Sequence, residues 1–171
     1  RTYGFLITVI DIVLHSFNVL KKIYYQKKVS KKAQRTGSDL RVNHKCDINN
    51  KTYIGNNVNF NAMSIAGGGK VAIGDNFHSG TECLIITDNH NYDNGDAIPY
   101  DDTYIRKQVI IKDNVWLGSR VTILPGVTIE EGAIIQAGST VTSDIPKGAI
   151  AGGHPAKVFD KRDMKHYKKH K

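Results

Sequence analysis

Cysteine is scarce in this sequence, and its scarcity limits both the class of protein and the kind of site. Cys46 and Cys83 are the two cysteines among 171 residues, far apart and in no spacing that suits a bound metal. A fold held by disulfides or by a cysteine-ligated metal needs more of them at closer intervals. We therefore expect a reducing compartment or one whose redox state is indifferent, no metal site, and no nucleophilic cysteine.

A long apolar run is missing as well. The apolar stretch from Phe5 to Leu20 falls short of the ~20 residues that a bilayer span needs, and Asp11, His15 and Asn18 interrupt it. No small-residue cleavage site follows it, so a secretory signal is not expected. These absences predict a cytoplasmic protein, with at most a peripheral contact at the inner face of the membrane.

The chain is basic, with a net charge of +8, but it lacks a nucleic-acid recognition motif. Residues 21–35 and 157–171 hold seven Lys or Arg each, whereas residues 36–156 carry nine bases and thirteen acids, a net of −4. The basic character therefore belongs to two flanks around a mildly acidic body. Such flanks are most often solvated, and they can also contact anionic lipid or cofactor phosphates. We expect no nucleic-acid partner.

The length allows one domain and one site, and its first segment is predicted to be helical. Polar residues recur at three- and four-residue spacing within 5–35 and form one stripe: Thr8, Asp11, His15, Asn18 and Lys22. The rest of the circumference is apolar. That surface must be covered by the chain's own domain, by a sister subunit or by a membrane surface, and packing is the simplest interpretation.

From residue 36 a period of six replaces the helical pattern. Large aliphatic residues recur without a miss at Ile111, Leu117, Ile123, Ile129, Ile135 and Val141. Four positions after each come small or β-branched residues: Val115, Val121, Val127, Ala133, Ser139 and Ile145. The same phase occurs at Ile54, Phe60, Ile73 and Ile85, with Val58, Ser64, Phe77 and Cys83 four positions on and Ser79 as a weak member.

A strict period of six excludes ordinary amphipathic helices and hairpins and indicates a solenoid. Each hexapeptide supplies a short strand and a corner, with its aliphatic side chain inside the stack. Gly or Asn often follows the aliphatic residue, as at Gly55, Gly74 and Gly118, and we expect Gly or Asn to adopt the positive φ of the bend. Cys83 falls on an inward position, so a packing role is expected for it.

Two insertions interrupt the repeat, at residues 66–70 and at residues 91–108. A solenoid accommodates an insertion as a loop leaving one edge, and long loops in compact domains are often functional. The first, Ala66-Gly-Gly-Gly-Lys70, lacks the continuation of a phosphate-binding loop and is expected to be a corner. The second is where a site is expected.

Four segments inside the repeat carry a resemblance to a known family. They are DNVWLGS (113–119), LPGVTI (124–129), QAGSTVT (136–142) and AGGHPAKV (151–158). Through them residues 36–160 resemble the hexapeptide-repeat acetyltransferases, especially the galactoside, maltose and streptogramin branch, and also acetyltransferases of surface-polysaccharide pathways. The resemblance implies an all-β fold, a left-handed parallel β-helix, here with an N-terminal helical segment (1–35) and a short basic C-terminal tail (161–171).

The resemblance also implies the assembly and the reaction. Members of this family form homotrimers in which the acceptor and acyl-CoA meet between two adjacent β-helices. The expected activity is O-acetylation of a sugar hydroxyl of a glycan or glycoside with acetyl-CoA as donor, by direct transfer and without a metal. N-acetylation of an amino sugar, acetylation of an antibiotic, and a non-catalytic scaffold are the alternatives. A γ-class carbonic anhydrase shares the fold, but its three zinc-binding histidines have no match here.

Transfer to a hydroxyl needs a base, and histidine is suited to that role. His90 lies where the repeat gives way to the long insertion, in a stretch that resembles the base of the streptogramin-type enzymes, a His followed three residues later by an Asp. On that resemblance His90 is the general base. Asp93 is expected to orient His90 or to bind the acceptor, or else to be merely solvated. Asn59 matches an acceptor-binding Asn of the sugar acetyltransferases, and a corner Asn with positive φ is the alternative.

The resemblance assigns the acetyl-CoA contacts to Trp116, Ser119, Ala137, Thr142 and Lys157. Trp116 would stack on the pantetheine arm or on a sugar, small residues permit close approach, and a backbone N–H would stabilise the oxyanion. The chain departs from the family's pattern at Asp160 and Ser143, where basic residues are usual, so Lys161 or Arg162 would replace those phosphate contacts. The four aspartates of residues 91–105, with no Lys or Arg among them, favour a neutral acceptor.

Overall fold

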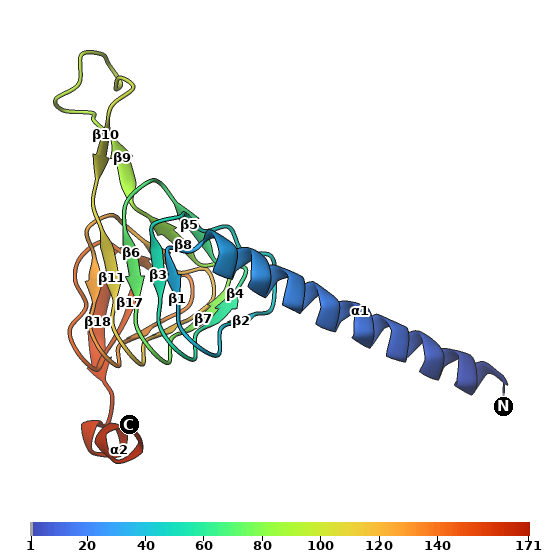
Figure 1. Cartoon of the computed structure of the whole chain (residues 1–171). Coiled ribbons are helices and arrows are strands. Elements are labelled where there is room, and N and C mark those ends of the chain that lie inside the picture. The colour runs from blue at the N-terminus through green and yellow to red at the C-terminus, as the bar shows by residue number, and fades with distance from the viewer. Residues whose placement is uncertain (1) are drawn as a thin grey trace.

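The computed structural model describes residues 2–171 and shows a solenoid of stacked parallel strands between two helices (Figure 1). Helix α1 (Thr2–Lys32) precedes the solenoid and α2 (Met164–His170) follows it. Within the described residues, no helix has the length and apolar content to cross a membrane. The solenoid is the left-handed parallel β-helix that the six-residue repeat and the resemblance predict.

The solenoid has three flat faces, which we name sheets A, B and C in the order in which the chain visits them. Sheet A contains β1 (Arg35–Thr36), β3 (Thr52–Ile54), β6 (Val71–Ile73), β11 (Val109–Ile111) and β14 (Thr128–Ile129). Sheet B contains β2 (Arg41–Val42), β4 (Asn59–Asn61), β7 (His78–Thr81), β12 (Trp116–Leu117), β15 (Ile134–Ile135), β17 (Ala149–Gly153) and β18 (Ala156–Lys161). Sheet C contains β5 (Ser64–Ala66), β8 (Leu84–Ile86), β13 (Thr122–Ile123) and β16 (Thr140–Val141). The edges between faces are called the A–B, B–C and C–A edges.

The predicted inward residues form the core of the stack. All six aliphatic residues from Ile111 to Val141 are buried, and so are the six residues four positions after them. Cys83 is buried as predicted, and burial raises the pKa of its thiol. Burial likewise raises the pKa of Cys46 to about 11, so both thiols are held in the protonated form and act as packing groups.

One predicted inward position is wrong. Ser64 is exposed, and Met63 and Ile65 on either side of it are buried instead. The cause is a corner shortened by one residue: inward residues are normally four apart across a corner, but Phe60 and Met63 are three apart. Ala62 adopts a φ of 53° in this tight bend, and the pairing of β4 with β7 shifts register between Asn59 and Asn61.

The corner chemistry is also partly different from the prediction. Asn57, Asn76 and Asn114 adopt positive φ at the A–B edge, as expected for Asn. Gly55, Gly74 and Gly118 do not, and they are needed for another reason. A Cβ on Gly118 would collide with the backbone nitrogen of Ala137 in the next coil, so glycine permits the close stacking of coils there.

Helix α1 ends earlier than predicted because the sheet begins earlier. Gln34 N donates to Thr52 O at 2.8 Å, and β1 pairs in parallel with Tyr53 and Ile54 of β3. The helix is attached to the stack through its last turns, where Val29 is buried and Tyr25 and Ala33 pack against the core. The predicted packing therefore covers the C-terminal end of α1, while several large apolar residues earlier in the helix are exposed, among them Val13, Phe17 and Leu20.

The segment predicted as a basic tail contains α2, which packs against the stack. Tyr167 Oη lies 3.0 Å from Asn114 Nδ2 and donates to Glu131 Oε1 at 2.9 Å, while Lys147 Nζ donates to Glu131 Oε2 at 2.7 Å. Hydrogen bonds from Lys147, Lys171 and Tyr167 lower the pKa of Glu131 to about 2. Helix α2 is thus fastened to the A–B edge by an ionised carboxylate.

Candidate active site

The long insertion leaves the stack at the C–A edge as a hairpin (Figure 1). Its arms are β9 (Asp88–His90) and β10 (Tyr104–Arg106), which pair antiparallel with Tyr104 opposite His90. The expected loop therefore begins with ordered strands that carry His90 away from the core. This arrangement places a histidine on a rigid arm beyond the face of the solenoid.

The first insertion, the Gly triplet, holds the base of this hairpin. Gly68 N donates to Asp88 Oδ2 at 2.9 Å, and Gly69 N donates to Thr87 Oγ1 at 3.0 Å. Arg106 Nε also donates to Asp88 Oδ2, at 3.3 Å. Burial acts to raise the pKa of Asp88, but the hydrogen bonds from Gly68, Arg106 and Thr87 outweigh it and lower the pKa. The triplet is a corner, as predicted, and Asp88 is a positioning residue to which the sequence analysis gave no role.

His90 is enclosed by aromatic rings from its own hairpin. Its imidazole stacks on Tyr100, with ring centroids 3.6 Å apart and planes 17° apart, and the ring of Tyr104 lies 4.6 Å away. Nδ1 is buried and has no hydrogen-bond partner within residues 2–171. Nε2 is therefore the nitrogen available to a reacting group, on an imidazole that two tyrosines orient.

Asp101 holds the tip of the hairpin by hydrogen bonds, whereas the aspartate with a predicted role was Asp93. Asp101 accepts hydrogen bonds from Asp96 N and Thr103 N, both at 2.9 Å, and bonds from Thr103 and Asp96 lower its pKa. Asp93 is exposed, and within the described chain no hydrogen bond connects it to His90. Asp93 is thus free to face an acceptor.

Two further predicted residues share the outer face of sheet B. The strand register aligns Asn59 of β4 with His78 of β7 and His78 with Trp116 of β12, so Asn59 and Trp116 lie two strands apart, about 10 Å. Trp116 is 49% exposed. Asn59 does not have positive φ, unlike Asn57, which excludes the corner alternative. Its Oδ1 accepts from Asn43 Nδ2 at 3.0 Å, which fixes the amide orientation.

Ser119 and Ala137 stack on one another at the B–C edge, where Gly138 N donates to Ser119 O at 2.8 Å. Thr81 N and its hydroxyl donate to Ser119 Oγ at 3.1 and 3.2 Å. A Cβ at Gly138 would meet nothing within 4 Å. The backbone of this edge is therefore open at Gly138.

The remaining predicted contacts lie apart from that edge. Thr142 is exposed at the C–A edge after β16, and Lys157 is exposed on β18 at the end of sheet B. Of the two substitutes for phosphate contacts, Arg162 is engaged, since its Nε donates to Gly132 O at 2.6 Å. Lys161 is exposed at the end of β18.

In one chain the predicted site residues therefore fall into two groups. His90 and Thr142 lie at the C–A edge, whereas Asn59, Trp116, Ser119 and Ala137 lie on sheet B or at the B–C edge. The width of sheet C separates the two groups. Within one chain the predicted base therefore shares an edge with Thr142 but is separated from the predicted contacts on sheet B and at the B–C edge.

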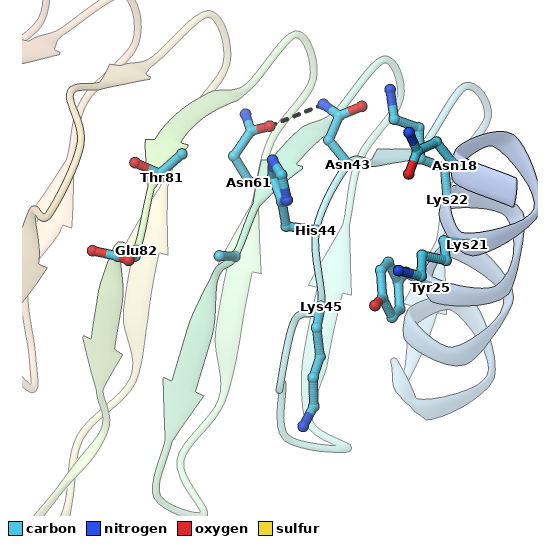
Figure 2. Close-up of a pocket in the computed structure, with 11 residues that line it drawn as sticks. Asn18, Lys21, Lys22, Tyr25, Asn43, His44, Lys45, Asn61, Thr81 and Glu82 are labelled. Carbon is cyan, nitrogen blue, oxygen red and sulfur yellow. Dashed lines mark hydrogen bonds between the residues drawn. The ribbon is translucent and has the colours of Figure 1, made fainter. Parts of the chain in front are cut away.

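A large hollow lies next to Asn61 and away from His90. It has a volume of about 1020 Å³ and lies between α1 and the B–C edge. Figure 2 shows Asn43 and Asn61 on its coil side and Asn18, Lys22 and Tyr25 on its helix side. Asn43 Nδ2 donates to Asn61 Oδ1 at 2.9 Å as well as to Asn59. Asn43 was missed in the sequence because its role depends on stacking in space, through an 18-residue separation.

Comparison with known proteins identifies relatives of this fold. The family description "Bacterial transferase hexapeptide (six repeats)" matches residues 108–143. A candidate acetyltransferase of Saccharomyces cerevisiae is 35% identical over 159 residues, which cover 88% of this chain and 79% of the yeast protein.

Two solved structures extend the comparison to proteins with bound ligands. A galactoside acetyltransferase in complex with coenzyme A is similar with a TM-score of 0.70 and 29% identity, covering 81% of this chain and 70% of that one. A hexapeptide-repeat acetyltransferase from Vibrio cholerae, complexed with acetyl coenzyme A, has a TM-score of 0.66 and 27% identity, covering 77% and 73%.

The β-helix fold and its similarity to acetyltransferases, two of them solved with coenzyme A or acetyl coenzyme A, define this protein as an acyltransferase. This chain belongs to the hexapeptide-repeat acetyltransferase family.

Proposed function

We propose that this protein transfers the acetyl group of acetyl-CoA to a hydroxyl of a neutral sugar in a glycan or glycoside. The reaction takes place between two protomers of a homotrimer and serves the synthesis of a surface polysaccharide. It occurs in the cytoplasm, at the inner face of the membrane. The observation that carries the proposal is the seating of His90, with one nitrogen buried and the other free, on an arm that extends beyond its own solenoid.

The chemistry is direct transfer with His90 as general base. Nε2 takes the proton of the acceptor hydroxyl while that oxygen attacks the thioester carbonyl, forming a tetrahedral intermediate. A backbone N–H at the B–C edge, near Ser119 or Ala137, stabilises the oxyanion. When the intermediate collapses, the carbon–sulfur bond breaks, and the imidazolium returns the proton to the leaving thiolate. No covalent acyl-enzyme is needed, and both thiols are buried.

The residues of the B–C edge fit an extended thioester donor. The galactoside and Vibrio cholerae relatives hold coenzyme A and acetyl coenzyme A, and the exposed indole of Trp116 offers a flat apolar surface beside the edge. Ser119 and Ala137 leave room for the pantetheine at this edge, and Thr142, at the C–A edge, would contact it from the neighbouring chain. Lys157 is exposed and able to meet a phosphate.

The separation of the two groups of residues supports the proposed trimer. His90 extends beyond the C–A edge, while Asn59, Trp116 and Ser119 face outward on sheet B and the B–C edge. A three-fold assembly sets the C–A edge of one chain against the B–C edge of the next and so completes three equivalent sites. The flat, exposed faces of the solenoid suit such packing.

The charge of the hairpin tip selects the acceptor. Its four aspartates would repel the pyrophosphate of a nucleotide-sugar, while Tyr92, Tyr100 and Tyr104 offer apolar faces and hydroxyls to a neutral sugar. Asp93 and Asn59 would contact this sugar. The side chain of Asp93 forms no hydrogen bond with another residue of the described chain. The acidic tip also attracts a cationic amine, so N-acetylation of an amino sugar is the alternative function.

The test is a screen of thiol release from acetyl-CoA with neutral glycosides, amino sugars and lipid-linked glycans as acceptors. For the acceptor that reacts, His90→Ala should lower kcat by roughly 10²–10⁴-fold, and His15→Ala, a histidine of α1, should have no effect. Near-normal turnover in folded His90→Ala would remove His90 from the mechanism. A nucleotide-linked amino sugar that exceeds every neutral glycoside tenfold in kcat/KM would establish the alternative.

A further inference from the structure

Helix α1 has two opposite faces, and only one of them meets the solenoid. Asn18, Lys22, Tyr25 and Val29 recur at spacings of four, three and four and therefore share a face. Val29 is buried and Tyr25 packs against the core. Asn18, Lys22 and Tyr25 line the hollow beside the first coils (Figure 2). The polar stripe of α1 thus faces the solenoid.

The opposite face carries apolar side chains that are exposed in the described chain; Lys21 Nζ lies 4.5 Å from the ring centroid of Phe17, and the ring centroids of Tyr24 and Tyr25 are 5.8 Å apart. Val13, Phe17, Leu20 and Tyr24 recur at the same spacings about half a turn away. Their side chains are 61%, 55%, 63% and 62% exposed. Toward the C-terminal end the same face continues with Lys27, Lys28 and Lys31, all exposed. We call these seven residues the outer stripe: apolar in its first half and cationic in its second.

We propose that the outer stripe is a membrane-binding surface that lays α1 in the interface of an anionic lipid bilayer. The apolar half would enter the boundary of headgroups and acyl chains, while the lysines meet anionic headgroups. Because the polar stripe faces the solenoid, the body of the protein would stand on the aqueous side.

The charges favour a lipid surface over a second copy of the chain. Copies of α1 packed in parallel along the outer stripe would bring Lys27, Lys28 and Lys31 against their own equivalents, which is repulsive. Asp11, the sole acidic residue of the helix, lies on the polar stripe, so its charge cannot offset the repulsion between these lysines. An anionic bilayer satisfies both halves of the stripe at once.

The experiment measures co-sedimentation of the full chain with vesicles of phosphatidylcholine alone or with about one third phosphatidylglycerol. The expected result is binding at least about tenfold tighter to the anionic vesicles, weakened by salt. Leu20→Asn should weaken binding about tenfold or more. The matched control is Val19→Asn, an exposed apolar residue about 100° round the helix, which should bind as the unchanged protein does.

Lys28→Gln should lower affinity on the order of fivefold, and on anionic vesicles only. All three variants should keep their acetyl-transfer rate on a soluble acceptor, so the result is independent of the proposed reaction. Equal binding to the two vesicle types, or equal effects of Leu20→Asn and Val19→Asn, would overturn the proposal. A change of mass in light scattering on Leu20→Asn would also overturn it, because the stripe would then be a contact between copies.

Discussion

The proposed division of the site between the edges of neighbouring chains predicts how mixed trimers should behave. Suppose that chains carrying His90→Ala and chains carrying Asn59→Ala are produced together and purified through two different tags, so that every trimer contains both. Each homotrimer of a single variant lacks one component of every site. Around a ring of three chains of two kinds, one interface joins an intact His90 to an intact Asn59. Mixed trimers should therefore recover about a third of the wild-type rate per trimer.

The measurement is thiol release from acetyl-CoA with the acceptor found in the screen. The parent homotrimers set the background, and doubly tagged wild-type trimers set the full rate. If His90 and Asn59 served the same site within one chain, no mixed trimer would contain a complete site. A rate no higher than that of the two parents would then refute the intersubunit site. The substitutions are suitable because both side chains lie outside the buried core.

Three further perturbations test the structure locally. Leu117→Ala should lower the free energy of unfolding by about 2–5 kcal/mol in denaturant titration. Trp116→Ala, at the neighbouring position, should leave the free energy of unfolding nearly unchanged and raise the KM for acetyl-CoA. Similar stability losses in the two variants would contradict the assignment of Leu117 to the inner face and Trp116 to the outer face. Asp88→Asn should lower kcat while circular dichroism stays native, because the hairpin loses its ionic anchor, and an unchanged kcat would show that the anchor is dispensable. Because the pKa of Glu131 is lowered from about 4.5 in the unfolded chain to about 2, its ionised carboxylate stabilises the fold above pH 4.5, and this stability is lost as the pH falls toward 2. Glu131→Gln should flatten that part of the profile of stability against pH. An unaltered acid transition in this variant would argue against a stabilising role for Glu131.

The solenoid could be predicted from the sequence because its core is set by local spacing. Ile123 and Ile135 both point inward because each ends a two-residue strand that is followed by a four-residue corner. Since this local rule repeats along the chain, it is visible in the sequence. Ser64 escaped the rule because one corner is a residue short. Gly118 was assigned the wrong reason, since its need for glycine comes from the neighbouring coil and not from its own φ.

The candidate site could be predicted less completely because the surroundings of its residues depend on contacts between coils. His90 was identified by its position at the end of the repeat, but its stacking on Tyr100 depends on how the hairpin folds back. Asn43 orients Asn59 across neighbouring coils. The edge on which each residue lies decides which residues can meet, and the edge becomes known only when the corners are counted correctly.

The two ends of the stack limit how a protein of this kind can change in length. The last turns of α1 cover the first coil, and β18 closes the other end by running antiparallel to β17. Between them one coil takes 18 residues, as the bond from Asn43 to Asn61 illustrates. Insertion of a whole coil after Ile123 would lengthen the prism and leave Ala137 on its edge. Insertion of a single hexapeptide into the coils would turn everything after it by one face and carry Ala137 away from Ser119. Viable descendants should therefore gain or lose whole coils, or vary in the loops that leave the edges, as residues 91–108 do.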